Sequence, residues 1–174
     1  PVCYKRLDEC KRGTLFDKYL DELVDNDDVM KECLLEAMGL ALSNIPGYLT
    51  KKAILMIGPK DCGKTQIKKL LTLLLGIKYT SSIELSKMST NNFATSELYN
   101  KRLAGSNDMQ YTAVADMGIF KQLTGGDPIS VEFKGRGAFS YVFTGLLWFL
   151  ANDFPKFSGK KEDAVYQRFV VIPC

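Results

Sequence analysis

Apolar residues recur every three or four positions in two stretches near the start of the chain, residues 14–24 and residues 29–42. This spacing places apolar side chains along one face of an α-helix, so it predicts two amphipathic helices. Asp27 or Asp28 is expected to cap the second helix, and the turn-forming residues 43–47 are expected to end it.

The next strong pattern is an unbroken apolar run at residues 53–57, which is typical of a central parallel strand covered on both faces. Gly58 ends this run, and a helical pattern occupies residues 64–75 before Gly76. Further strands are predicted at residues 77–83, 102–106, 129–133, 138–143, 146–151 and 168–172, and helices at residues 92–99 and 112–123. The alternation predicts an α/β fold with a central, mostly parallel sheet, a β-hairpin inserted around residues 135–137, and an N-terminal helical segment.

Length and charge refine this picture. The chain has 174 residues, of which 46% are hydrophobic and 25% charged, so it fits one compact globular domain. Residues 17–36 hold 8 acidic residues against 2 lysines, whereas the remainder holds 21 Lys+Arg against 12 Asp+Glu, a net charge of +9. This excess suits a polyanionic partner, although scattered solvated lysines would give the same count.

The residue types exclude several kinds of chemistry. The chain has no His, and its five cysteines form no CxxC pair, so zinc sites and Ser-His or Cys-His catalysis lack their usual residues. The longest apolar stretch, residues 139–151, is shorter than the roughly 20 residues of a membrane helix, and the start does not have the pattern of a signal peptide. We expect no membrane partner and a cytoplasmic location in a bacterial host cell. Because the chain begins with Pro1 and ends directly after an apolar run, we expect a fragment truncated at both ends.

One string carries specific chemistry, and it matches GxxxxGK[ST] at every position: Gly58, Pro59, Lys60, Asp61, Cys62, Gly63, Lys64 and Thr65. Such a loop turns backbone N–H groups toward phosphate oxygens, and the helix that begins at Lys64 adds its positive dipole end. Lys64 is expected to reach the phosphates of ATP, and the Thr65 hydroxyl to hold Mg²⁺. A chance glycine turn is the alternative, but the predicted strand before the string and helix after it favour a P-loop.

A P-loop needs an acidic partner on the metal side, at the end of another strand. Asp108 follows the short run at residues 102–106 and is the candidate, with an ordinary Asx turn as the alternative. Asp116 is a competing candidate, although it lies within a predicted helix. Asn152 follows the buried strand at residues 146–151 and could orient the attacking water, or could serve as a turn residue only.

Further strings occur in a characteristic order along the chain. They are residues 53–65, the run from Lys101 that leads to Asp108, residues 121–129 with the sequence KQLTGGDPI, residues 147–155, and residues 163–173 with the ending RFVVIP. In this order they resemble the superfamily-three AAA+ helicase module of phage, plasmid and mobile-island replication proteins, the poxvirus-like primase-helicase group. The resemblance extends over residues 14–174.

The resemblance implies an AAA+ P-loop ATPase that assembles into a ring, usually a hexamer, and moves along single-stranded DNA. Lys64 and Thr65 are then the first-motif residues, Asp108 the second-motif acid, Asn152 the sensor, and Arg168 the arginine finger offered to the ATP of a neighbouring subunit. Residues 1–50 correspond to a helical collar-like segment and residues 51–174 to the ATPase domain. Two features depart from the family pattern: Gln167 precedes a lone Arg168, and the second motif lacks a doubled acid.

The predicted hairpin resembles the DNA-gripping loop of that family. Lys134 and Arg136, with Gly135 between them, form a compact cationic tip that could hold backbone phosphates without reading bases, and Phe133 and Phe139 border it. A surface hairpin with two solvated cations and two core aromatics is the alternative.

The expected function is therefore that of a replicative helicase of a phage or mobile genetic element, with any primase or origin-binding domain outside this chain. Two alternatives stay open. One is a P-loop small-molecule kinase, and the other is a nucleotide-switched DNA-binding module without significant hydrolysis.

Overall fold

The computed structural model describes residues 13–90, 93–109, 117–155 and 163–174, so the competing candidate Asp116 lies outside the described residues. Its centre is a five-stranded sheet in the order β2-β3-β6-β1-β7. All four neighbouring pairs are parallel. The strands are β1 (Ala53–Ile57), β2 (Thr80–Ser81), β3 (Leu103–Ala104), β6 (Leu146–Ala151) and β7 (Phe169–Pro173).

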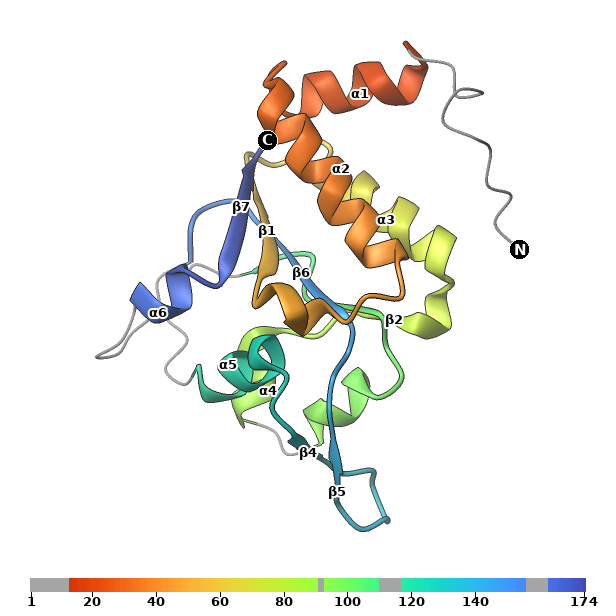
Figure 1. Cartoon of the computed structure of the whole chain (residues 1–174), viewed down its shortest axis with the longest axis vertical. Coiled ribbons are helices and arrows are strands. Elements are labelled where there is room, and N and C mark those ends of the chain that lie inside the picture. Colours follow the sequence, from red (N-terminus) through yellow and green to blue (C-terminus); the bar gives the residue numbers. More distant parts are fainter. Residues whose placement is uncertain (1–12, 91–92, 110–116, 156–162) are drawn as a thin grey trace.

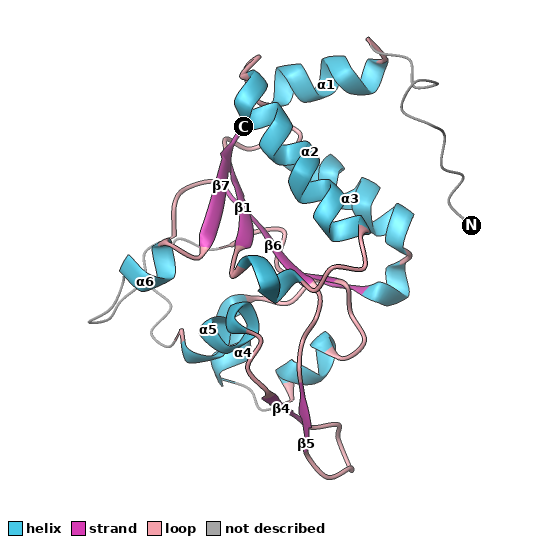
Figure 2. Cartoon of the chain, viewed as in Figure 1, coloured by secondary structure: helices cyan, strands magenta, loops and turns pink. Residues whose placement is uncertain are grey.

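Helices cover both faces of this sheet, which confirms the predicted α/β class (Figures 1 and 2). On one face lie α1 (Leu15–Leu23), α2 (Asp28–Leu42) and α3 (Lys64–Leu75). On the other lie α4 (Leu85–Thr90) and α5 (Gly118–Gly125), while α6 (Asp163–Tyr166) precedes β7. Short 3₁₀ helices η2 (Gly47–Thr50), η3 (Ile77–Tyr79) and η4 (Ala94–Leu98) occur in the connections.

The two-residue period of the central strands divides the core between these faces. Leu55 and Phe149 point into the cluster with α4 and α5, whereas Ile54 and Trp148 point into the cluster with α1, α2 and α3. Because both faces are covered, β1 and β6 are almost entirely buried and carry unbroken apolar sequences. This is the reason that both strands could be predicted from the sequence with their observed bounds.

The acidic helical pair α1–α2 packs onto the main body. Leu20 and Leu34 are fully buried in the same cluster as the strand residues Met56 and Trp148. Asp27 caps α2, because its side chain accepts hydrogen bonds from the backbone N–H groups of residues 29 and 30.

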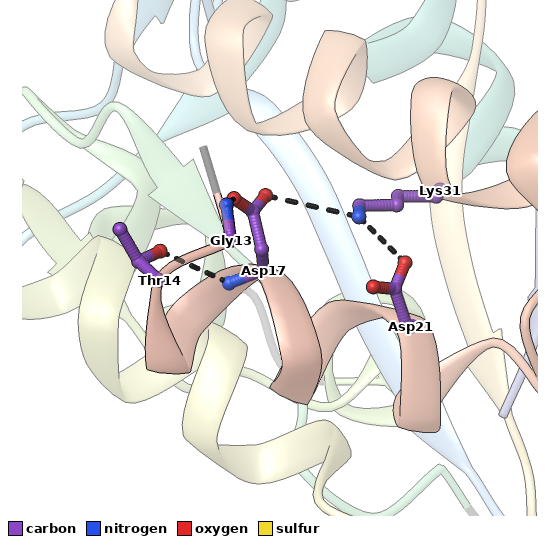
Figure 3. A network of polar contacts seen from close by, with 5 residues as sticks. All are labelled: Gly13, Thr14, Asp17, Asp21 and Lys31. Carbon is purple, nitrogen blue, oxygen red and sulfur yellow. Dashed lines mark hydrogen bonds and ion pairs between the residues drawn. The ribbon is translucent and has the colours of Figure 1, made fainter. Parts of the chain in front are cut away.

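A polar network also joins the two helices (Figure 3). Thr14 caps α1 by accepting from the N–H of Asp17 at 3.2 Å, and the Lys31 ammonium of α2 lies 3.7 Å from Asp17 and 2.5 Å from Asp21. The contacts of Lys31 join two successive turns of α1 to α2.

A separate two-stranded antiparallel ribbon is formed by β4 (Ile129–Val131) and β5 (Phe139–Tyr141), and it projects at the end of the molecule opposite α1 (Figure 1). Its turn carries Lys134 and Arg136, both exposed. Next to this turn, the Tyr99 ring meets the rings of Phe133 and Phe139 edge-on, with ring centroids 5.6 and 5.4 Å apart.

Several predicted elements were wrong in kind or length. The segment predicted as a strand at residues 77–83 begins as η3 and contributes only two residues to β2, because Ile77 is 82% exposed rather than part of the core. The predicted strand at residues 102–106 is reduced to β3, and the predicted helix at residues 92–99 is the 3₁₀ helix η4. Helices α4 and α6 were not predicted.

Candidate functional site

The loop of residues 58–65 lies at the carboxyl end of β1 and leads directly into α3. A Cβ atom on Gly58 would lie 2.2 Å from the carbonyl oxygen of Cys174, so no side chain fits there. Gly63 is the N-cap of α3 and has φ +108°, a conformation that residues with side chains rarely adopt. Glycine at these two positions lets the loop curl against the end of β7 and turn into the helix.

The Lys64 ammonium is held at the centre of this loop. Lys64 is 7% exposed, and its Nζ donates to the carbonyls of Gly58 at 2.6 Å and Pro59 at 2.7 Å and lies 3.3 Å from Cys62 Sγ. All three N–H donors of the lysine therefore have acceptors within the loop. An anion that entered the loop would take the place of one or more of these acceptors as a hydrogen-bond partner of the Lys64 ammonium.

A cavity of about 420 Å³ adjoins the loop. Residues from three separate segments line it: Lys60, Asp61, Cys62, Gly63, Lys64, Thr65 and Gln66 of the loop and α3, Asn107 and Asp108 after β3, and Asn152 after β6. The structure thus brings the two candidate residues Asp108 and Asn152 to the same cavity as Lys64 and Thr65. This is the carboxyl edge of a parallel sheet, where ligands of open α/β folds bind.

The segment that carries Asp108 is tied to strands on both sides. The N–H of Gly105 donates to the carbonyl of Ser81 in β2 at 3.2 Å, and the N–H of Met109 donates to the carbonyl of Leu150 in β6 at 2.7 Å. Asp108 itself is exposed to the cavity. The carboxylate therefore projects from a backbone that is fixed at either end.

Lys68 adds a side-chain link between α3 and the same segment. It lies one helical turn after Thr65, is 6% exposed, and its Nζ donates to the carbonyl of Gly105. Burial lowers the pKa of Lys68 to about 7. The first turns of α3 and the segment leading to Asp108 are held together by this buried amine.

A second cavity, of about 490 Å³, runs along α3 from Thr65 to Leu73 and shares Thr65 and Asn107 with the first. Lys68 and the hydroxyls of Thr80, Ser81 and Ser82 contribute to its lining. Leu73 and Ile77, which are 80% and 82% exposed, lie at the same cavity.

The N-terminal helix also reaches the loop. The Tyr19 hydroxyl donates to the carbonyl of Gly63 at 2.9 Å, and atoms of its ring and hydroxyl lie 3.2 to 3.4 Å from the position of a Cβ on Gly63. Burial, with smaller contributions from the thiols of Cys174 and Cys62, raises the pKa of Tyr19 to about 12. The tyrosine is therefore neutral and serves as a hydrogen-bond donor across the physiological pH range.

Arg168 lies away from this cavity. It directly precedes β7, and its carbonyl accepts from the N–H of Ala53 at the start of β1, so it is at the amino edge of the sheet. Its NH1 donates to the carbonyl of Lys121 at 3.0 Å and to the Thr124 hydroxyl at 2.7 Å, both in α5. Two of the strings on which the family resemblance rests, residues 121–129 and 163–173, thus meet through Arg168.

Lys134 and Arg136 lie in the turn between β4 and β5, and the ribbon that these strands form projects from the opposite end of the molecule to α1 (Figure 1). The rings of Phe133 and Phe139 both contact the Tyr99 ring, and Phe139 is 37% exposed. The ribbon therefore presents two cations and one accessible aromatic side chain.

Four residues at the site were not singled out from the sequence. Asn107 and Gln66 are direct neighbours of Asp108 and Thr65, so proximity in the sequence was a usable signal for both. Tyr19 contacts Gly63, which is 44 positions away in the sequence, and Lys68 contacts Gly105, which is 37 positions away. Neither helix-face periodicity nor motif spacing carries information about contacts at such separations.

Comparison with known proteins places the chain in a family. A family model matches residues 56–168, and its description is Family of unknown function (DUF5906). The chain belongs to the DUF5906 family. The matched region of this DUF5906 member includes the whole loop of residues 58–65, together with Asp108, Asn152 and Arg168. No curated protein sequence matches the chain.

Solved structures with a similar fold include the C-terminal region of NrS-1. One apo structure of that region matches with a TM-score of 0.68 and 18% identity over 90% of this chain, and another with a TM-score of 0.68 and 17% identity over 90%. This chain covers only 36% and 37% of those structures. A structure of JCV helicase with a bound small molecule has 19% identity over 93% of this chain and 46% of that chain, with a TM-score of only 0.47. At these identities the NrS-1 similarity shows a shared fold.

Within the described residues, no helix is both long enough and apolar enough to cross a membrane.

Proposed function

We propose that this chain is the motor of a replicative DNA helicase, which binds ATP and Mg²⁺ around Lys64, hydrolyses the ATP, and moves along single-stranded DNA. The observation that carries the proposal is the convergence of Lys64, Thr65, Asp108 and Asn152 on one cavity at the carboxyl edge of a parallel sheet. These residue types in this arrangement supply the charge and the positioning that phosphoryl transfer to water needs.

The phosphates of ATP would bind where the Lys64 ammonium now meets the carbonyls of Gly58 and Pro59. The first-turn N–H groups of α3 and the helix dipole add to the positive potential there. Asn152, which lines the same cavity at the end of the neighbouring strand β6, would orient the attacking water through its side-chain amide.

The donor set around the loop fits magnesium better than zinc or another soft metal. In the part of the chain that the structure describes, the loop included, there is no group of three or more His, Cys, Asp or Glu side chains that could hold a metal ion by itself. Mg²⁺ usually binds one or two protein oxygens together with phosphate oxygens and water, and the Thr65 hydroxyl and Asp108 carboxylate suit that role. When bound, the ion neutralises charge on the transferring phosphate.

Arg168 and the ribbon supply the parts of the proposal that involve partners. Because Arg168 lies at the amino edge of the sheet, it would act on ATP that is bound to a neighbouring subunit of a ring, and not on ATP bound to its own chain. To do so, Arg168 would first have to break its hydrogen bonds with Lys121 and Thr124. Lys134 and Arg136 project from the opposite end of the molecule to α1, where they can hold the phosphates of single-stranded DNA.

The test of this proposal is phosphate release from ATP, measured with and without single-stranded DNA over a series of protein concentrations. The proposal predicts turnover that rises with DNA and rises more than proportionally with protein concentration, because complete sites form only between subunits. Turnover per subunit that is constant with concentration and unaffected by DNA would exclude a DNA-stimulated ring motor.

The second cavity gives one specific reason to consider a small-molecule kinase as an alternative. It adjoins Thr65 and Asn107, so an acceptor molecule bound there would lie next to the proposed phosphate site. The two functions differ in one requirement, since a kinase needs the acceptor. ATP turnover stimulated by DNA without any added acceptor excludes the kinase.

A further inference from the structure

Helix α1 carries two neighbouring aromatic side chains, Tyr19, which contacts the loop that holds Lys64, and Phe16, which lies next to Tyr19. Tyr19 packs on Gly63 and hydrogen-bonds to its carbonyl. Phe16 is one helical turn earlier, with its ring centroid 6.2 Å from that of Tyr19 and the two ring planes 32° apart. Phe16 is 38% exposed, so part of its ring faces solvent. The two rings extend an aromatic surface from Gly63 outward.

A nucleotide whose phosphates lie in the loop still needs a surface for its base. The residues that line the 420 Å³ cavity in the described chain include no aromatic side chain. In a nucleotide, the ribose separates the base from the phosphates, so the base lies outside the phosphate site. The flat face of the base is apolar enough to stack on an aromatic ring. The aromatic surface of α1 begins at Gly63 and extends away from it, so it occupies a suitable place.

The helix that carries these rings is held in position before any ligand binds. The residue after Phe16 is Asp17, whose N–H is bonded to Thr14 and whose carboxylate accepts from the N–H of Gly13 at 2.8 Å (Figure 3). Lys31 of α2 then ties this turn of α1 to the next helix. A preorganised surface loses little conformational entropy when a ligand stacks on it.

We propose that the Phe16–Tyr19 face of α1 is the nucleobase subsite of this protein, a stacking surface for the purine or pyrimidine ring of a nucleoside triphosphate. The inference rests on the proposed nucleotide site, whose phosphate end is Lys64. Stacking does not distinguish between bases, because every base has a flat π-face. The Tyr19 hydroxyl already donates its hydrogen bond to Gly63, so it does not donate to a base. ATP, GTP and CTP therefore bind with similar affinities.

The test compares two ligands that share phosphates and differ in the base, ATP and inorganic tripolyphosphate, both with Mg²⁺, by isothermal titration calorimetry. The wild-type chain binds ATP more tightly than tripolyphosphate. Phe16→Ala weakens ATP binding about tenfold and leaves tripolyphosphate binding unchanged within about twofold. Phe16→Leu keeps an apolar side chain but has no ring, and it weakens ATP binding in the same way as Phe16→Ala. Phe16→Tyr keeps the ring and binds ATP with the wild-type affinity.

Leu15→Ala is the matched control, because Leu15 is the neighbouring residue on α1 and is 85% exposed. It changes the affinity for neither ligand. An equal loss of both affinities in Phe16→Leu, or no loss of either, overturns the subsite. Equal affinities of the wild-type chain for ATP and tripolyphosphate overturn the subsite but leave the phosphate site intact. A wild-type chain that binds neither ligand overturns the proposed nucleotide function together with the subsite.

Discussion

Lys68 provides a prediction that can be worked out quantitatively from the structure. Its amine is 6% exposed and bonded to the Gly105 carbonyl, and burial alone lowers its pKa from 10.5 to about 7. A lysine with a depressed folded-state pKa holds fewer protons in the folded than in the unfolded chain at every pH between these two values. Stability must therefore rise with pH through this range and fall as pH drops toward 7.

The magnitude follows from the two pKa values of Lys68. Between about pH 7 and pH 8.5 the unfolded chain keeps the Lys68 proton while the folded chain loses it, so the free energy of unfolding rises by about 1.5 kcal/mol. Above this window a second group acts in the opposite sense. Burial raises the pKa of the Cys174 thiol to about 12 from an ordinary value of 9.0, so stability is lost as pH rises through 9.

The assay is urea denaturation followed by circular dichroism at several pH values, with wild type, Lys68→Met and Lys69→Met. Lys69 is the matched control because it is the next residue of α3 and is exposed. Wild type and Lys69→Met are expected to gain about 1.5 kcal/mol across the window, whereas Lys68→Met is expected to be flat. Equal pH slopes in all three proteins would show that the Lys68 amine is not desolvated as described.

Three further predictions concern the proposed site. Asp108→Asn is expected to retain nucleotide binding, measured by calorimetry, but to lose phosphate release; wild-type release would remove the metal-side role. Lys134→Ala with Arg136→Ala is expected to weaken single-stranded DNA binding and to reduce the salt slope, d log K/d log [salt], by about 1.4 for two lost phosphate contacts; an unchanged slope in a fluorescence titration would make the ribbon a surface feature only. Arg168→Ala and Lys64→Ala proteins are each expected to be inactive alone, yet mixing them restores some ATPase because some interfaces join an intact lysine to an intact arginine. Wild-type turnover by Arg168→Ala alone, under conditions where the ring forms, would refute the finger role.

The parts of the fold that could be predicted are those that depend on short-range pattern. Strand β1, the loop and α3 are contiguous, and each has a local cause: an apolar run, glycines at Gly58 and Gly63, and helical periodicity as far as Leu75. Strand β6 was predictable for the same reason, since burial on both faces leaves an unbroken apolar sequence.

The rest of the site depends on contacts that no local pattern encodes. Strands β2 and β3 contribute two residues each, and Gly105 and Ser106 interrupt the apolar run that would otherwise mark β3. The contacts of Tyr19 with Gly63 and of Lys68 with Gly105 arise only when the sheet forms and α1 and α3 pack against it. The role of Arg168 came from the order of motifs alone, whereas Asp108 and Asn152 were also chosen because each follows a predicted strand. All three roles stay predictions.

The proposed helicase function depends above all on hydrolysis of ATP in the cavity around Lys64. The most direct test is phosphate release by wild type and by Lys64→Ala, both shown to be folded by circular dichroism, with single-stranded DNA at protein concentrations that favour assembly. Within the described residues, the Lys64 ammonium donates to Gly58, Pro59 and Cys62 of its own loop, so its removal should spare the fold while removing the charge that the phosphates need. We expect the rate of phosphate release by Lys64→Ala to be about a hundredfold or more below that of wild type. A folded Lys64→Ala protein that releases phosphate at the wild-type rate would contradict the proposed hydrolysis.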